Sequence, residues 1–265
     1  MDTIPAVVPR TKPARDWSRH LPSGAAFAWL RAGWRDFLTR PGLSLAYGLL
    51  VFAVSAITVW GLFAFRLDYI LFPAFAGFMV IGPLLALGLY EKSRRLAAGE
   101  PVTLAAMLFV RMASGGQVLF TGVLLCLVML LWWRAAVIVY ALFFGLRPFP
   151  GLDHVVGMLA TTPTGWAMAL VGGTVGALFA GFGFAISAFS IPMLLERRVD
   201  ALTAMGSSVA LVWHNLGVML TWGAIVLALF LVSLATGLVG LIVVFPLLGH
   251  GTWHAWRAIR PAAAP

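Results

Sequence analysis

Charged side chains are scarce in this sequence. Only 10% of the 265 residues are Asp, Glu, Lys or Arg, whereas 62% are hydrophobic, and an ordinary soluble domain is about 25% charged. A soluble fold of this length could not bury so much apolar surface. We therefore expect lipid to be the solvent for most of the chain, and we expect one all-α membrane domain.

Cysteine and catalytic motifs are nearly absent as well. The single cysteine, Cys126, lies inside an apolar run, so an intramolecular disulfide and a cysteine-based metal cluster are excluded. We expect it to be a small buried hydrophobic residue. The chain has no phosphate-binding glycine loop, no HExxH and no GxSxG, and it has no hydrophilic segment long enough for a soluble active site. An enzyme is therefore the least supported class of function, and we expect none.

Six apolar stretches are long enough to cross a bilayer, which needs about 20 residues at about 1.5 Å rise. The short link at Arg66 predicts that the first two form an antiparallel hairpin. Residues 201–256 contain no Asp, Glu, Lys or Arg, which is too long for one span. We divide this stretch at a tight turn, residues 233–237, where Gly237 permits left-handed backbone angles. The predicted spans are 43–65, 69–90, 116–145, 166–195, 213–232 and 238–256.

Basic residues gather on one side of these spans. If the N-terminus is inside the cell, the outside segments hold only Arg66 and Arg147. Lys and Arg near span ends stay in the cytoplasm, so we expect a bacterial inner-membrane protein with both termini cytoplasmic. The net charge of +9 then indicates contact with an anionic leaflet and not with nucleic acid. The inside residues are Arg10, Lys12, Arg15, Arg19, Arg31, Arg35, Arg40, Lys92, Arg94, Arg95, Arg111, Arg197, Arg198, Arg257 and Arg260.

The ends of the chain differ in composition from the rest. We expect residues 1–24 to form a disordered basic tail, residues 25–258 the membrane domain, and residues 259–265 a short cytoplasmic tail. Residues 1–42 lack the compact apolar core and small-residue cleavage site of a signal peptide, so we expect the first span to act as an uncleaved insertion signal.

An internal threefold repeat is indicated by three related strings near the ends of the even-numbered spans. IGPLL, SIPML and VFPLL place Pro83, Pro192 and Pro246 at corresponding positions. Proline removes a helical hydrogen bond and kinks membrane helices, so a shared kink at equivalent depth predicts three hairpins of similar geometry. Chance placement of the prolines is the alternative.

A mixed apolar and polar stretch precedes each odd-numbered span. We expect these stretches to form short interfacial helices, the first with Trp29 and Trp34 at headgroup level. Pro101 and Asp200 occupy positions typical of helix starts in the second and third. The stretches are residues 27–37, 101–112 and 200–212.

Polar residues at corresponding positions of this repeat are candidates for a site. Glu91, Asp200 and His254 each lie eight residues beyond their proline. Two carboxylates and a neutral imidazole at the cytoplasmic mouth would suit a divalent metal or a proton relay. His250 and His254 share a helix face, a spacing that also allows metal binding. The simpler interpretation is that each is a separate polar residue at headgroup level.

Two further features lie within the spans. Arg134 follows two tryptophans in the third span, and a charge inside a membrane is a candidate functional group. The alternative is that Arg134 reaches the outer boundary and anchors the helix there. In the fourth span two series of small residues recur every four positions, which indicates that this helix packs closely against another helix. The alternative is that the glycines line a substrate path. The two series are Gly173, Ala177 and Gly181, and Gly172, Gly176 and Ala180.

The strings GPLLALGLYE, from Gly82 to Glu91, and FPLLGH, from Phe245 to His250, resemble a bacterial family of predicted integral membrane proteins. This family is domain of unknown function 2189, and the resemblance extends over residues 34–260. Some of its members carry the label of a cytochrome c oxidase subunit, which implies a possible association with a respiratory oxidase. A haem-copper catalytic subunit has twelve spans and six histidine ligands, whereas this chain has six predicted spans and five histidines, including His20, His154 and His214.

These observations favour a non-enzymatic membrane protein without a cofactor that serves as an accessory, assembly or structural component of a larger complex. A transporter or channel for small solutes is the first alternative, and it requires a polar cavity near the midplane. A metal- or haem-binding membrane protein is the second, and it requires the histidines to lie within ligand distance of carboxylates or of one another.

Overall fold

The computed structural model describes residues 17–145 and 152–260, and all of the regular elements in these residues are helices. The expected all-helical fold is therefore confirmed. In chain order the elements are α1 (Ala25–Leu38), α2 (Pro41–Ala64), the 3-10 helix η1 (Asp68–Ile70), α3 (Leu71–Leu85), α4 (Leu87–Ala98), α5 (Leu104–Leu108), α6 (Gly115–Phe144), α7 (Leu152–Thr161), α8 (Pro163–Ser187), α9 (Ser190–Glu196), α10 (Ala201–His214), α11 (Leu216–Ala235) and α12 (Leu241–Ile259).

Five helical segments in the described residues are long and apolar enough to cross a membrane, and they correspond to the first five predicted spans. The protein is therefore an integral membrane protein with several spans. The sixth predicted span is the helix α12, but it is not among the five because its C-terminal half carries His250, His254 and Arg257. The five segments are Pro41–Ala64, Pro73–Ala98, Gly115–Phe144, Pro163–Glu196 and Leu216–Ala235.

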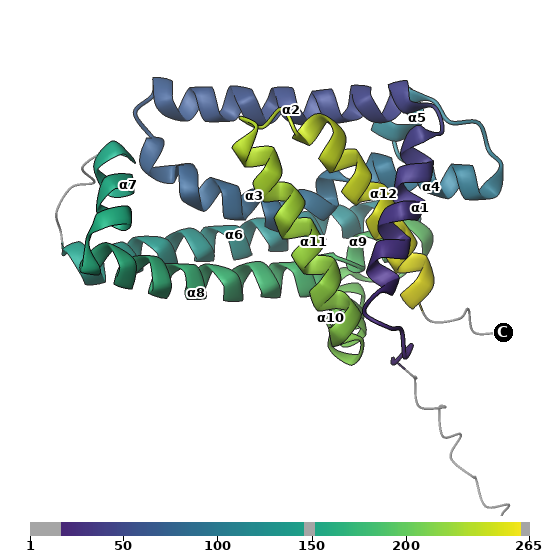
Figure 1. Cartoon of the computed structure of the whole chain (residues 1–265). Helices are drawn as coiled ribbons and strands as arrows, with labels where there is room; N and C mark the ends of the chain where they lie inside the picture. The colour runs from purple at the N-terminus through teal and green to yellow at the C-terminus, as the bar shows by residue number, and fades with distance from the viewer. Residues whose placement is uncertain (1–16, 146–151, 261–265) are drawn as a thin grey trace, which may run out of the picture.

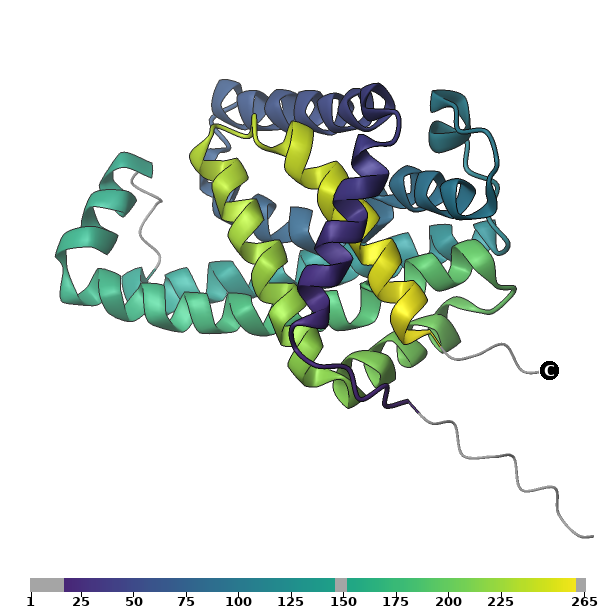
Figure 2. The same cartoon turned by 45° about the vertical axis from the view of Figure 1, so that its right-hand side comes forward.

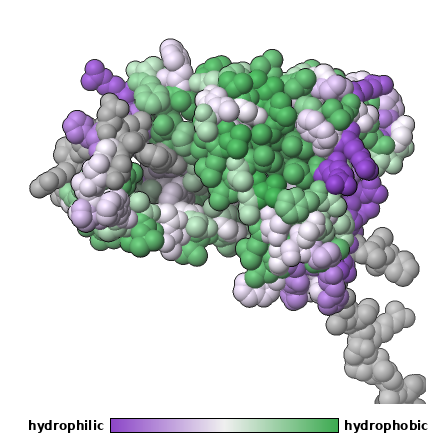
Figure 3. Space-filling model, viewed as in Figure 1, coloured by the Kyte–Doolittle hydropathy of each residue, from purple (hydrophilic) through white to green (hydrophobic). Residues whose placement is uncertain are grey.

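The long helices α2, α3, α6 and α8 run alongside one another, while α11 and α12 cross them obliquely (Figures 1 and 2). Both described ends of the chain lie at one end of the bundle, together with α1, α4, α5 and α10. We call this the terminal end. The helix α7 and the turn at Arg66 lie at the opposite end. The surface between the two ends is largely apolar, and a hydrophilic strip covers the terminal end over α1 (Figure 3).

Helix α12 is the centre of the terminal end, because it packs against α1, α2 and α4. Two glycines allow this close approach. A Cβ atom at Gly33 of α1 would lie 2.6 Å from the backbone nitrogen of Gly251, and one at Gly48 of α2 would overlap the carbonyl oxygen of Ile242. Half of α12 is thus surrounded by protein and not by lipid, and its polar side chains find partners there.

The predicted prolines stand at different points of their helices. Pro83 lies inside α3, three residues before the break at Ala86, and Pro192 is the third residue of α9. Pro246 lies inside α12, which continues past it. The threefold repeat with kinks at equivalent depth stays a prediction.

The break between α8 and α9 is stabilised by a side chain from α10. The hydroxyl of Ser208 accepts a hydrogen bond from the backbone N–H of Phe189 at 3.1 Å and donates one to the carbonyl of Ala185 at 2.7 Å. A backbone group freed inside the membrane must find a partner within the protein, and Ser208, which is fully buried, supplies it.

Several local predictions need correction. Residues 17–24 are not a free tail, because Arg19 bonds Asn215 and the carbonyl of Ile259. Trp29 is buried against Trp222 at 6.0 Å and so does not lie among headgroups, although Trp34 is exposed. The second interfacial helix begins after Thr103, whose hydroxyl caps it, and not at Pro101.

Other local predictions are confirmed. Asp200 caps α10 by accepting a hydrogen bond from the N–H of Thr203 at 2.8 Å. Gly237 has a φ of +62°, so the turn before α12 uses the left-handed backbone expected of this glycine. Arg147 lies outside the described residues. The helix α7 was not foreseen, because its ten residues are too few for a span.

Candidate functional site

The three residues expected to converge do not come together. Glu91 is fully buried and binds Arg94 and Arg95 of its own helix, Asp200 caps α10, and His254 binds Asp36 of α1 at 2.9 Å. Within the described ranges no three His, Cys, Asp or Glu residues are close enough to hold a metal ion. The common offset from the prolines failed to predict convergence, because each helix directs its residue to a different neighbour.

A buried polar chain nevertheless crosses the terminal end and joins α1, α2, α4 and α12. It consists of Lys92, Ser44, His250, Ser93, Asp36 and His254. The Lys92 ammonium donates to the Ser44 hydroxyl at 2.7 Å and to the carbonyl of Arg40 at 3.3 Å. His250 contacts the Ser44 hydroxyl through Nε2 at 3.0 Å and the Ser93 hydroxyl through Nδ1 at 2.8 Å. Lys92, Ser44 and His250 are each 0% exposed.

The hydrogen bonds of this chain can all point in one direction. Ser44 accepts from Lys92 and so donates to Nε2 of His250, which leaves Nδ1–H to donate to Ser93. Ser93 and His254 both hydrogen-bond the carboxylate of Asp36. The buried Lys92 ammonium is thereby linked to the Asp36 carboxylate through three neutral groups, which are the side chains of Ser44, His250 and Ser93. In such an arrangement each hydrogen bond strengthens the next.

Asp36 lies outside the membrane-spanning segments, and its pKa is lowered. Burial alone would raise the pKa of this carboxyl group, but the hydrogen bonds from His254 and Ser93 and the positive charge of His254 outweigh burial. Asp36 is therefore the anionic end of the buried polar chain at neutral pH, and its partner His254 carries the contact between α1 and α12.

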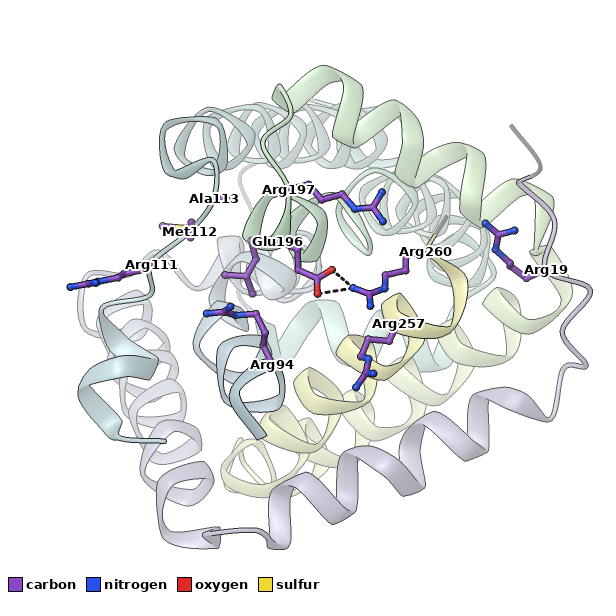
Figure 4. A pocket seen from close by; sticks show the side chains of 10 residues that line it. Arg19, Arg94, Arg111, Met112, Ala113, Glu196, Arg197, Arg257 and Arg260 are labelled. Carbon is purple, nitrogen blue, oxygen red and sulfur yellow. Dashed lines mark hydrogen bonds and ion pairs between the residues drawn. The ribbon is translucent and has the colours of Figure 1, made fainter. Parts of the chain in front are cut away.

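A second feature of the terminal end is a pocket of about 900 Å³ in which six arginines and one carboxylate gather (Figure 4). The N-terminal segment, α4, the α5–α6 loop, α9 and α12 all contribute, so only the folded chain assembles it. We call it the arginine pocket. Its lining residues are Arg19, Arg94, Arg111, Met112, Ala113, Leu195, Glu196, Arg197, Arg257 and Arg260.

Glu196 is the acidic residue in the lining, and it is strongly bonded. Both of its oxygens accept from Nη1 of Arg260, at 2.6 and 2.7 Å, and one accepts from the indole N–H of Trp256 at 2.8 Å. Arg197 lies 5.6 Å from the centre of the same indole ring, a cation–π contact. The floor of the arginine pocket is thus fixed by charge-assisted bonds between α9 and α12.

The remaining candidates lie within the spans. Arg134 is exposed on α6 and lines a pocket with Tyr69 and Trp133. Tyr69 follows the turn at Arg66, so this pocket lies away from the terminal end, which favours the anchoring interpretation. Cys126 is exposed on α6 and not buried as expected, because α6 is apolar on every face and its sequence does not show which face points inward.

The two series of small residues on α8 have different surroundings. A Cβ atom at Gly176 would lie 3.0 Å from Trp132, and one at Gly172 would lie 3.6 Å from Val139, so this series packs against α6. A Cβ atom at Gly173 or Gly181 would meet nothing within 4 Å. The series of Gly173, Ala177 and Gly181 is therefore exposed.

Sequence reasoning missed the central members of the buried polar chain. The sequence places Lys92 among the cytoplasmic basic residues, because it follows an apolar run, and the two serines are too common in membrane helices to attract notice. The spacing of His250 and His254 was the one usable signal, since it marked the α12 face that carries both histidines. Asp36 and Glu196 left no comparable signal.

The comparison with known proteins agrees with the membrane architecture. Residues 71–196, from the start of α3 to the end of α9, match the profile of a family described as predicted integral membrane protein, DUF2189. No curated protein and no solved structure matches the chain. The segment from α3 to α9 is therefore similar to the DUF2189 family of predicted integral membrane proteins.

Proposed function

We propose that this protein is a non-enzymatic component of the bacterial inner membrane that serves as an accessory or structural partner of a larger membrane complex. The buried polar chain carries the proposal. Its ionisable groups are hydrogen-bonded to one another, directly or through the two serines, between four helices at one end of the bundle, so they hold those helices together. In a transporter such groups would line a cavity near the midplane.

The proposed topology has six spans with both termini in the cytoplasm. The polar half of α12 faces α1, α2 and α4, so low hydropathy does not exclude it from the membrane. An even number of spans returns the chain to its starting side, and the hydrogen bond of 3.0 Å between Arg19 and the carbonyl of Ile259 joins the two ends. The arginines of this end favour the cytoplasmic side.

Cysteine labelling tests this topology. In a Cys126→Ala background, Arg66→Cys is expected to react with an impermeant thiol reagent added outside the inner membrane, and Arg257→Cys only after the membrane is opened. The opposite pattern would show that the orientation is inverted. Reaction of both cysteines from the same side would contradict the six-span arrangement.

The open small-residue series of α8 is a face on which a partner helix can pack, because small residues let helix backbones approach closely. Purification in mild detergent followed by native mass spectrometry tests the accessory role. The protein is expected in a particle heavier than one chain, and Gly173→Leu with Ala177→Leu is expected to release it. Gly61→Leu is the control, since a Cβ atom at Gly61 also meets nothing within 4 Å.

Two outcomes would contradict the accessory role: a single chain at every protein concentration, or dissociation by the control as readily as by the paired variant. Oxidase subunits in the particle would identify the association that the family resemblance implies.

A further inference from the structure

The arginine pocket has more positive charge than its own carboxylates neutralise. Glu196 in the lining and the buried Glu91 behind Arg94 are the acidic partners that the structure places there. Within residues 17–145 and 152–260, Arg111 and Arg257 make no hydrogen bond or ion pair, and both are exposed. Repulsion among these guanidinium groups remains unless a further anion enters the pocket.

The geometry already shows how an oxyanion fits. Glu196 is held at 2.6 to 2.8 Å by Arg260 and Trp256, which are the short distances of charge-assisted hydrogen bonds. The fork of Arg94 uses Nε and Nη2 for Glu91, so its Nη1 stays available to a second acceptor. Arginine forks match the planar spacing of phosphate and carboxylate oxygens.

The height of the pocket indicates the kind of anion. Arg94 belongs to the span Pro73–Ala98, and Arg197 directly follows the span Pro163–Glu196. The pocket is therefore at the level where a bilayer places its phosphates, and basic pockets between membrane helices at this level suit lipid headgroups. We propose that the arginine pocket binds a phosphate group, carried by the headgroup of an anionic phospholipid or by a soluble phosphate compound.

Binding is measured on the full chain purified in a mild detergent. One arm adds phosphatidylglycerol or phosphatidylcholine and counts bound lipids by native mass spectrometry. The other arm titrates inorganic pyrophosphate at constant ionic strength and follows the thermal unfolding midpoint. We expect a preference for phosphatidylglycerol if the ligand is a lipid, and stabilisation by pyrophosphate if the ligand is soluble.

The variant Arg111→Gln with Arg257→Gln removes two charges that have no partner in the described residues, so folding is spared. It is expected to weaken binding roughly 25-fold, since each of the two basic residues near a membrane surface contributes roughly fivefold. The control, Arg31→Gln with Arg35→Gln, removes the same charge from exposed positions of α1 at the same end. It is expected to change binding less than about twofold.

Glu196→Gln gives a prediction of opposite sign. The amide oxygen still accepts hydrogen bonds from Arg260 and Trp256, but the negative charge that competes with the ligand is gone, so phosphate binding is expected to tighten severalfold. The proposal is overturned if neither probe binds the native protein, if both paired variants lose binding equally, or if Glu196→Gln weakens binding. None of these readouts requires a partner complex, so the result is independent of the accessory role.

Discussion

Ser44 occupies the middle of the buried polar chain, and its replacement by alanine provides a sharp test of the chain. Ser44→Ala removes the acceptor 2.7 Å from the Lys92 ammonium and the hydroxyl 3.0 Å from Nε2 of His250. A hydrogen bond to a charged group is worth about 1.5 to 3 kcal/mol, and an unsatisfied buried neutral group costs about 1 to 3 kcal/mol. Because neither partner is exposed, we expect a total loss of about 2.5 to 6 kcal/mol in the free energy of unfolding.

Lys92→Met changes the balance in a different way. The variant loses both hydrogen bonds of the ammonium but no longer buries a cation, so its expected cost is smaller, about 0 to 2 kcal/mol. In the Lys92→Met background Ser44 has only His250 to satisfy, and Ser44→Ala is then expected to cost about 1 kcal/mol. The double-mutant cycle therefore predicts a coupling energy of at least about 1 kcal/mol.

The assay is reversible unfolding in mixed micelles, followed by the fluorescence of the eleven tryptophans. Thr58→Ala is the matched control on α2, because its exposed hydroxyl bonds only the carbonyl of Val54 in the same helix, and it is expected to cost less than about 0.5 kcal/mol. If Ser44→Ala costs the same with and without Lys92, the residues act separately and our account of the terminal end fails.

Three further predictions concern helix contacts. Gly48→Leu is expected to lose about 1 to 3 kcal/mol of unfolding free energy, because its Cβ atom would overlap the carbonyl oxygen of Ile242. Denaturation in micelles measures this loss. Equal stability of Gly48→Leu and Gly61→Leu would refute the prediction. Ser208→Ala is expected to cost about 1 to 3 kcal/mol of unfolding free energy, because it leaves the N–H of Phe189 without a partner. The neighbouring control, Ser207→Ala, should change the unfolding midpoint little. Similar losses in the two variants would argue against the role of Ser208 at the α8–α9 break. Asp36 has a lowered pKa, so its stabilising contribution is present above the ordinary pKa of 3.8 and is lost as the pH falls through the lower pKa of the folded protein. Asp36→Asn should flatten this part of a curve of stability against pH. An unchanged curve would contradict the assignment.

The apolar runs and the scarcity of charge were enough to identify a helical membrane protein and to place its first five spans. The reason is that lipid contacts most of these helices directly, so each span must carry its own hydrophobicity. Short-range rules also sufficed for the cap at Asp200 and the turn at Gly237, since both depend on a few neighbouring residues. The basic residues indicated a polar end, without showing which of them would meet.

Only the tertiary structure decided what the polar residues do. α12 combines an apolar and a polar half. Gly33 lets α1 approach the polar half closely at Gly251, and Gly48 lets α2 approach the apolar half at Ile242. Its hydropathy alone could not show this, because hydropathy measures the fit to lipid and not to neighbouring helices. The partners of Lys92 and Glu196 come from helices far away in the chain. Such pairings follow from the way the helices cross, and no local pattern in a single sequence records that crossing.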